Sequence, residues 1–206
     1  MSAKADVFEL YRTGPRENLL VDPAHGPILT LEDAVAQAKP FTTIYLAEGA
    51  YTCKTPITKP GLIIEKKDAE KDVFIVGCAG SVVTVDLEGD HFVVFKKIIF
   101  MHTGMNLNLK FKESAPNQPK YAMNPNTQAL REFDICRGMD TIMWLENGGL
   151  MLRECEVTYN ALPKNLKSRF PAIIALPNTM LNMTSCKLIG SDTGHSGGVI
   201  LLNANA

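Results

Sequence analysis

The feature that most constrains the fold of this chain is an internal repeat in its C-terminal third. Residues 141–160 align without gaps with residues 172–191, at an offset of 31 residues. Apolar residues fall on apolar residues in the pairs Ile142 with Ile173, Leu145 with Leu176, Leu150 with Leu181, Leu152 with Met183, Cys155 with Cys186 and Val157 with Leu188. Short strands that repeat without an intervening helix are typical of a solenoid, in which equivalent side chains stack from coil to coil. The offset of 31 residues is longer than one coil without insertions, and we assign the additional residues to the polar loop 161–170.

The same pattern of short strands extends through most of the chain. We expect strands at 43–46, 62–64, 73–76, 82–85, 93–95, 98–100 and 107–111. They are rich in β-branched residues and are bounded by Gly, Asn, Asp or Pro, as strands commonly are. The stretch from Val93 to Phe100 has the apolar spacing of the repeat, and Val199 to Leu202 begins a further coil.

Only one helix is predicted with clear boundaries. Thr30 is placed as its N-cap, and Asp33 three residues later completes a pattern close to a capping box. Apolar residues then follow at helical spacing, at Leu31, Ala34, Val35 and Ala38. Lys39-Pro40 ends the helix, because proline cannot continue it.

The chain is expected to form one domain after an irregular start. Gly and Pro residues interrupt residues 1–28, which are therefore expected to be irregular. Residues 29–206 are expected to form a single domain. Within it, residues 113–140 break the strand pattern with three prolines and several Asn and Gln residues. We interpret them as a long surface insertion, with one or two helical turns near 127–133. A linker between two domains is less favoured, because the same strand pattern resumes afterwards.

The stretch ILTLEDAVAQAKPFTTIYLAEGAYTCKTPITKPGLIIE resembles the opening of right-handed parallel β-helix proteins of the pectin-lyase-like class. It carries a short capping helix, a strand, a Gly-x-Tyr turn at Gly49–Tyr51 and a Lys-Pro-Gly corner at Lys59–Gly61. The later coils are similar to the carbohydrate-binding and sugar-hydrolase (CASH) repeats. Such repeats also occur in intracellular F-box adaptors and SHC-binding spindle proteins. The resemblance implies an all-β fold, a right-handed parallel β-helix with a short N-terminal capping helix.

The catalytic motifs of the pectin-lyase-like class are not matched in this sequence. Pectin methylesterases carry a Glu two positions after the Gly-x-Tyr tyrosine, where this chain has Cys53. The Arg-x-Pro-x-x-Arg motif of pectate lyases begins at Arg169 but lacks its second Arg. Polygalacturonases require Asp residues held together for acid and base catalysis, and no such pair is evident in the sequence. We therefore expect no catalytic site and no enzyme activity.

Two further patterns are interpreted as structural. Gly194 to Gly198 fits the G-x-S-x-G pattern of hydrolases, but no His follows the serine, and a strand is expected after it instead of a helix. The four histidines, His25, His91, His102 and His195, are not spaced as metal ligands with a Cys or with one another. We therefore expect no metal site and no cofactor. Asn residues at the corners are expected to stack in hydrogen-bonded ladders.

Charge and cysteine content exclude several classes of function. Lys plus Arg number 21 against 22 Asp plus Glu, and the net charge of −1 argues against nucleic-acid binding and a polybasic membrane anchor. The first residues lack a secretory signal, and no apolar run approaches the roughly 20 residues of a membrane span. Five cysteines without a C-x-x-C pair indicate reduced thiols, so we expect a cytoplasmic protein. The resemblance extends this expectation to a cytoskeletal or ciliary association.

A rigid β-helix without a catalytic cluster is best suited to binding. We expect a non-enzymatic scaffold for protein–protein interaction, either an adaptor or a cytoskeletal component. Candidate interaction residues lie in the insertion, in the loop 161–170 and in the last coil, namely Tyr121, Arg131, Lys164, Lys167, Arg169, Val199 and Leu201. Loops on a rigid scaffold commonly carry recognition, which is the reason for this choice. The alternative is a carbohydrate-active enzyme or a carbohydrate-binding module.

The last coil is expected to be covered. It begins near Gly197, and no capping pattern follows it, so it would expose apolar side chains and unpaired strand edges. The expected cover is a protein partner, more of a longer chain, or a second subunit, with end-to-end self-association as one form.

Overall fold

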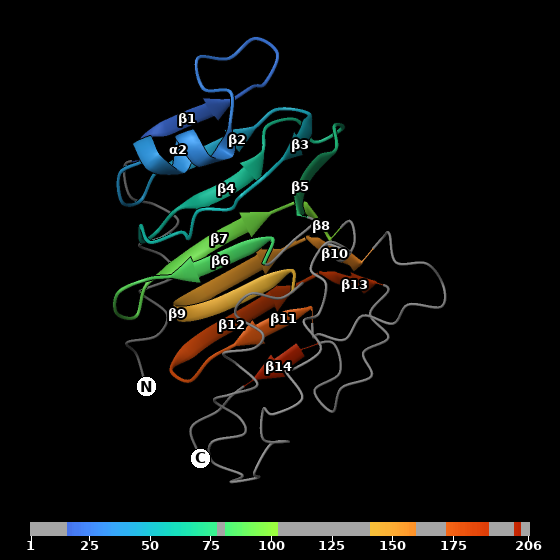
Figure 1. Ribbon diagram of the computed structural model, residues 1–206. Helices are drawn as coiled ribbons and strands as arrows, with labels where there is room; N and C mark the ends of the chain where they lie inside the picture. The colour runs from blue at the N-terminus through green and yellow to red at the C-terminus, as the bar shows by residue number, and fades with distance from the viewer. Residues whose placement is uncertain (1–15, 78–80, 103–140, 160–171, 190–199, 203–206) are drawn as a thin grey trace, which may run out of the picture.

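The computed structural model describes residues 16–77, 81–102, 141–159, 172–189 and 200–202 (Figure 1). These residues wind into a parallel β-helix with three faces, here named sheets A, B and C. Sheet A contains β1 (Asn18–Val21), β2 (Thr43–Leu46), β4 (Ile63–Lys66), β7 (Phe92–Lys96), the second half of β9 (Met143–Arg153) and β12 (Thr179–Thr184). Sheet B contains β3 (Gly49–Tyr51), β5 (Val73–Gly77), β8 (Ile99–His102), β10 (Glu156–Tyr159) and β13 (Lys187–Ile189). Sheet C contains β6 (Val83–Asp86), the first half of β9, β11 (Ile173–Ala175) and β14 (Ile200–Leu202).

Each coil passes from sheet A to sheet B and then to sheet C, and every strand pair is parallel. Coil 3 is β4, β5 and β6, and coil 4 is β7, β8 and the first half of β9. Coil 5 is the second half of β9, β10 and β11, and coil 6 is β12, β13 and β14. In coil 2, Ile57 takes the place of a sheet C strand and bridges to Val85. This path confirms the all-β parallel β-helix implied by the resemblance.

The helix α2 (Leu31–Gln37) lies over the N-terminal end of the solenoid (Figure 1). The Thr30 hydroxyl oxygen accepts a hydrogen bond from the Asp33 backbone N–H at 3.1 Å, which confirms the predicted N-cap. Leu31, Ala34 and Val35 are buried against β1 and β2. None of the described helices is long and apolar enough to cross a membrane.

Strand β1 corrects one expectation from the sequence. It lies within residues 1–28, which were expected to be irregular, and it pairs in parallel with β2. The strand is only four residues long, and a turn begins directly after it at Asp22. So short a strand next to Gly and Pro residues gives no clear sequence pattern. Its pairing adds a first, incomplete coil beneath α2.

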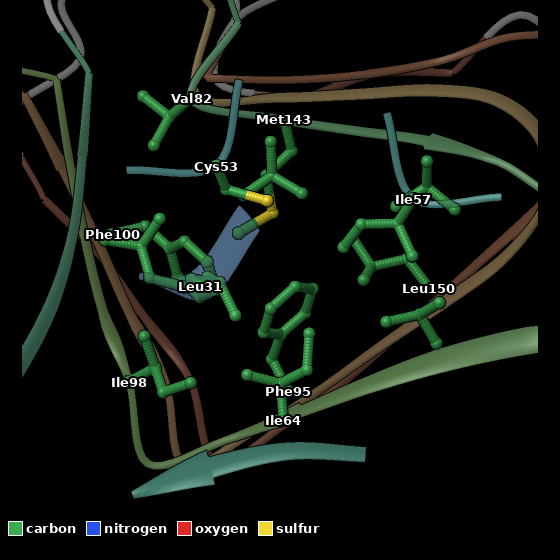
Figure 2. Packing of buried hydrophobic residues seen from close by; sticks show 14 of the residues in the cluster. Leu31, Cys53, Ile57, Ile64, Val82, Phe95, Ile98, Phe100, Met143 and Leu150 are labelled. Atoms are coloured by element: carbon green, nitrogen blue, oxygen red, sulfur yellow. The ribbon is translucent and has the colours of Figure 1, made fainter. Parts of the chain in front are cut away.

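The core lies inside the coils and takes side chains from all three sheets. Figure 2 shows Ile64 and Phe95, from sheet A, Phe100, from sheet B, and Met143, from sheet C, in this shared interior. Each of these four side chains has a relative exposure of 0%. The rings of Phe95 and Phe100 meet edge to face at a centroid distance of 5.1 Å.

The register of the repeat is confirmed in sheets A and B and corrected in sheet C. Leu150 pairs with Leu181, Leu152 with Met183 and Val157 with Leu188, all at the offset of 31. In sheet C, Ile173 pairs with Met143 and not with Ile142. The corner that joins β11 in sheet C to β12 in sheet A contains one more residue than the equivalent corner in the middle of β9. Asn178 turns that corner with a left-handed φ of 63°, and Thr179 N–H bonds to Leu176 O.

The remaining strand predictions vary in outcome. The strand 43–46 has the predicted bounds, whereas those predicted at 62–64 and 98–100 are β4 and β8, displaced toward the C-terminus. Gly49–Tyr51, which the resemblance placed in a turn, is strand β3. The predicted strand 107–111, the insertion 113–140 and the turns near 127–133 lie outside the described residues.

Candidate functional site

The corner between sheets A and B is tight in the last three coils. It consists of residues 97–98 in coil 4, 154–155 in coil 5 and 185–186 in coil 6. Its first residue has a left-handed backbone each time, with φ of 56° at Lys97, 54° at Glu154 and 54° at Ser185. The left-handed residue reverses the chain sharply enough for the next side chain to enter the core.

Coil 3 differs at this corner because residues 67–72 lengthen it. The Asp68 carboxylate accepts the Glu70 N–H at 3.0 Å, and Asp68 O accepts the Lys71 N–H, which closes a compact turn. The Lys71 ammonium forms an ion pair with the Glu48 carboxylate at 3.1 Å, which links coil 3 to coil 2. This long corner therefore stands out from the tight corners of coils 4 to 6.

A cleft of about 340 Å³ lies between this long corner and the tight corners that follow it. It is lined by Lys66, Ala69, Asp72, Val73, Lys97, Ile98, Ile99, Glu154, Cys155, Glu156, Ser185 and Lys187. Three ammonium groups, three carboxylates and one hydroxyl thus border one cleft, which we name the corner cleft. The Lys97 ammonium and the Glu154 carboxylate lie 3.7 Å apart, and both side chains are largely solvated. Solvent screening makes such a pair worth well under ~1 kcal/mol, so both groups are available to a ligand.

The thiol in the corner cleft is unsuited to nucleophilic chemistry. Cys155 is 2% exposed, and burial raises the pKa of its thiol to about 11. Its S–H has two backbone acceptors, Phe95 O at 3.4 Å and Arg153 O at 3.3 Å. Only the thiolate is a strong nucleophile, so a thiol held protonated acts here as a small apolar core residue.

Cys53, which stands where the methylesterase pattern has a Glu, is a core residue. Its thiol is 3% exposed, and burial raises its pKa to about 12. Two residues earlier, the Tyr51 hydroxyl donates to Ala47 O at 2.8 Å, and its pKa is raised to about 12 by burial and by the Asp22 charge. Both side chains face the interior of coil 2, where they contribute packing. Among the residues described, no three His, Cys, Asp or Glu side chains gather as a metal site.

The corner between sheets C and A holds a short polar ladder. The Asn147 side-chain amide donates to the Asp86 carboxylate at 2.7 Å, joining the sheet C ends of coils 3 and 4. The bond joins an Asn to an Asp, and the expected ladder of stacked Asn residues stays a prediction. Gly148 follows with φ of 78°, and a Cβ there would lie 2.6 Å from the Leu87 side chain.

The connections from sheet B to sheet C vary widely in length. They are residues 52–56, 78–82, 103–142, 160–172 and 190–199, followed by Ile57 in coil 2 or by a sheet C strand. The strand order places the start and end of every one at the same edge of the solenoid, which we name the loop edge. The tight A–B corners carry no comparable insertion after coil 3.

Of the seven predicted interaction residues, the structure describes only Leu201. Tyr121, Arg131, Lys164, Lys167, Arg169 and Val199 belong to the connections of the loop edge and lie outside the described residues. Leu201 lies in β14, paired in register with Ile174. The corner cleft was missed, because its charged residues come from four coils and share no motif. The six-residue interruption between Lys66 and Val73 was the available sequence signal.

No family model matches the chain, and no curated protein matches its sequence. Among solved structures, pectin methylesterase PemA from Erwinia chrysanthemi matches 85% of this chain with a TM-score of 0.49 and 11% identity. A pectin methylesterase mutant in complex with a hexasaccharide matches 90% of it, with a TM-score of 0.45 and 10% identity. The chain spans 49% of the first protein and 74% of the second.

Proposed function

We propose that this chain is a β-helix scaffold that binds a protein partner through its loop edge. The observation that supports this proposal most directly is the contrast between corners. Insertions collect at the B–C connections, whereas the A–B corners of coils 4 to 6 stay at two residues. A rigid solenoid with variable segments on one edge is the arrangement that many recognition proteins use.

The buried reactive groups are consistent with a role in binding. Cys53, Cys155 and Tyr51 face the interior, and burial raises the pKa of each. Cys53, Cys155 and Cys186 are free thiols, which suits the reducing cytoplasm that we propose as the location. Association with the cytoskeleton or a cilium would be a finer form of the same role.

The sixth coil adds a second contact region to the proposal. Leu188 is 37% exposed, although its register partner Val157 is 1% exposed. Leu181 and Met183 are likewise only half-buried, whereas Leu150 and Leu152, one coil earlier, are fully buried. We propose that a protein partner stacks on this open coil, because its exposed interior column suits another apolar layer.

The test captures partners on three forms of the full chain. The first is unmodified, the second has residues 113–140 replaced by a short Gly-Ser linker, and the third is the control Lys97→Ala. We expect the unmodified chain and the control to enrich the same defined protein from native extract, and the linker variant to lose it. Purified partner should then bind the unmodified chain directly. Capture that is independent of residues 113–140, or no partner at all, would contradict the proposal.

A second candidate, carbohydrate binding, is favoured by the corner cleft. Its ammonium groups, carboxylates and Ser185 hydroxyl supply the mixed donors and acceptors that a polar, hydroxyl-rich ligand requires. Retention on an acidic polysaccharide column that is lost in Lys97→Ala and Lys187→Ala, but kept in the linker variant, would establish this function. The two variants therefore separate the two candidates, because each removes one proposed site and leaves the other.

A further inference from the structure

Two cysteines occupy the same position in neighbouring coils. Cys155 is the second residue of the A–B corner in coil 5, and Cys186 is the second residue of the same corner in coil 6. Both are free thiols, and Cys186 packs against the core cluster that contains Cys155. The residues before them, Glu154 and Ser185, have the same left-handed φ of 54°. These matching corners turn both cysteine side chains the same way, toward the interior.

The backbone holds the two corners one strand spacing apart. The Glu154 N–H donates to Thr184 O at 2.9 Å just before the two cysteines. The Lys187 N–H donates to Cys155 O at 2.9 Å just after them, and β10 and β13 continue in register from that point (Figure 1). Neighbouring strands lie about 4.8 Å apart. The Cα atoms of the two cysteines therefore fall within the range of about 4.4–6.8 Å that disulfides require.

The two sulfur atoms make equivalent contacts, one coil apart. The Cys155 Sγ lies 3.4 Å from Phe95 O in coil 4. The Cys186 Sγ lies 3.4 Å from Leu152 O in coil 5, and Leu152 is the register partner of Phe95. The Cys186 sulfur is thus directed toward the coil that contains Cys155. Joining the two sulfurs requires side-chain rotation and only a small approach of the two Cβ atoms.

The two thiols differ in their access to solvent. Cys155 is 2% exposed, whereas Cys186 is half-buried. Susceptibility to oxidation increases with exposure, so a dissolved oxidant reaches Cys186 first. The buried Cys155 thiol is unsuited to an external substrate, but it can react with a sulfur that lies beside it. Besides burial, which is the main cause, the neighbouring Cys186 contributes to the raised pKa of Cys155, as groups close together do.

We propose that Cys155 and Cys186 are a redox-active pair that hydrogen peroxide converts into a disulfide between coils 5 and 6. The Cys186 sulfur attacks one peroxide oxygen, which gives a sulfenic acid and releases water. The Cys155 sulfur then attacks the Cys186 sulfur. The S–S bond forms, the S–O bond breaks, and hydroxide leaves with the Cys155 proton as a second water. The two thiols lose two electrons in all, and the peroxide gains them.

The disulfide fastens the half-exposed coil 6 to the coil before it. The bond joins positions separated by the repeat offset of 31 residues, so it closes one turn of the solenoid. In a reducing compartment such a bond is transient, and disulfides of this kind commonly act as redox sensors. This modification site is distinct from the proposed partner contacts at the loop edge.

Peptide mapping of the full chain tests the proposal. The folded protein is treated with a small excess of hydrogen peroxide, the remaining thiols are blocked, and trypsin digestion is done without reductant. The tryptic peptides 154–164 and 170–187 contain Cys155 and Cys186 as their only cysteines. We expect these two peptides to be joined with the loss of two hydrogens and to be separated by a reductant. Peptides joined through other cysteines, or Cys186 oxidised to a sulfinic acid beside a free Cys155, would overturn the proposal.

Three variants and a denatured control establish that the fold brings the pair together. Cys155→Ala and Cys186→Ala should each abolish the joined peptides. The matched control Cys53→Ala removes another buried free thiol, from coil 2, and should keep them. Circular dichroism identifies the variants that remain folded. We expect the disulfide to form at least about tenfold faster in the folded chain than in urea, because folding fixes the two sulfurs side by side. Equal rates would show that the pairing is a chance encounter.

Hydrogen exchange measures what the disulfide does to coil 6. The Lys187 N–H bonds to Cys155 O, so its exchange reports opening of the joint between coils 5 and 6. We expect oxidation to slow this exchange at least about tenfold. The Lys67 N–H, which bonds to Leu46 O between coils 2 and 3, is the control and should be unchanged. An unchanged Lys187 rate in the oxidised chain would contradict the fastening of coil 6. These measurements need no protein partner, so the proposed function stands or fails separately.

Discussion

The A–B corners and the B–C connections of this solenoid differ in how much their length varies. The A–B corners of coils 4 to 6 contain two residues each and repeat one left-handed backbone at Lys97, Glu154 and Ser185. The B–C connections vary from a few residues to the long stretch 103–142. At the two-residue A–B corners the second residue, such as Ile98, is a core residue, so an insertion there displaces a core side chain. The B–C connections also contribute core residues, such as Cys53, Val82 and Ile142, but the number of their other residues differs from coil to coil.

This difference indicates that the A–B corners contribute mainly to stability, whereas the B–C connections are free to serve recognition. A corner that places a side chain in the core is held by packing, and packing tolerates few changes. An edge where the chain leaves and returns to the sheets costs little for added length, because loop-closure entropy grows slowly. Changes at the A–B corner should therefore affect stability more than equivalent changes at the loop edge.

Inserting Gly-Ser-Gly-Ser between Lys97 and Ile98 should have the largest effect. It displaces Ile98 and shifts β8 against its neighbours, so we expect a loss of about 3 kcal/mol or more in the free energy of unfolding. The same insertion between residues 165 and 166, on the loop edge, should cost less than about 1 kcal/mol. Urea unfolding followed by circular dichroism measures both. Equal losses at the two sites would remove the distinction between the corners.

Truncating the first core residue after the corner should have the next largest effect. Ile98 is 0% exposed, and Ile98→Ala should destabilise the fold by about 2–5 kcal/mol through lost contacts and a cavity. Its neighbour Ile99 points outward and is half-buried, so Ile99→Ala is the matched control, with an expected loss of about 1 kcal/mol. Thermal or urea denaturation compares the two. A loss at Ile99 as large as that at Ile98 would contradict the assigned register.

The Cys155 thiol at this corner should make stability fall at high pH. Burial raises the pKa of Cys155 to about 11 from its ordinary value of 9.0, so the folded state holds the proton more tightly than the unfolded state. The stabilisation by the protonated thiol is present below pH 9.0 and is lost as the pH rises through about 11. Urea midpoints measured across this range for the unmodified chain and for Cys155→Ala should converge at the alkaline end. A constant difference between them would argue against a buried, protonated thiol.

Relieving the left-handed backbone should have the smallest effect, and it should stabilise the fold. Glu154 has φ of 54°, which disfavours every residue except Gly and, less strongly, Asn or Asp. We expect Glu154→Gly to raise the free energy of unfolding by about 0.5–1 kcal/mol. Glu156→Gly, inside β10, is the control and should lower the same free energy by a similar amount. A destabilised Glu154→Gly would show that the side chain, more than the backbone, stabilises this corner.

Much of the fold was predictable because it repeats locally. The N-cap at Thr30 and the offset of 31 between Leu150 and Leu181 follow from short-range patterns, and both are confirmed. Strand β1 was missed because four residues carry too little periodicity, and its partner β2 begins more than twenty residues later. The register of Ile173 shifted by one residue because a single extra corner residue leaves no mark on a gapless alignment.

The corner cleft was less predictable than the fold. Lys97 and Glu154 lie 3.7 Å apart, yet they are separated by the whole insertion in the sequence. Lys187 enters the same cleft from a third coil. Stacking brings such residues together, and no linear motif records which of them share a cleft.

The amino-acid pattern alone was enough to predict a solenoid of short strands that begins with a helix. Alternating apolar residues and repeated corners act over a few residues, so their pattern is legible in one dimension. The tertiary structure alone decided that Ile63, Val94 and Met151 form a buried strip on an outward face. It also decided that charges from separate coils border one cleft. The physical reason is that inward and outward residues of a strand can both be apolar, and only the assembled coils determine what covers the outward face.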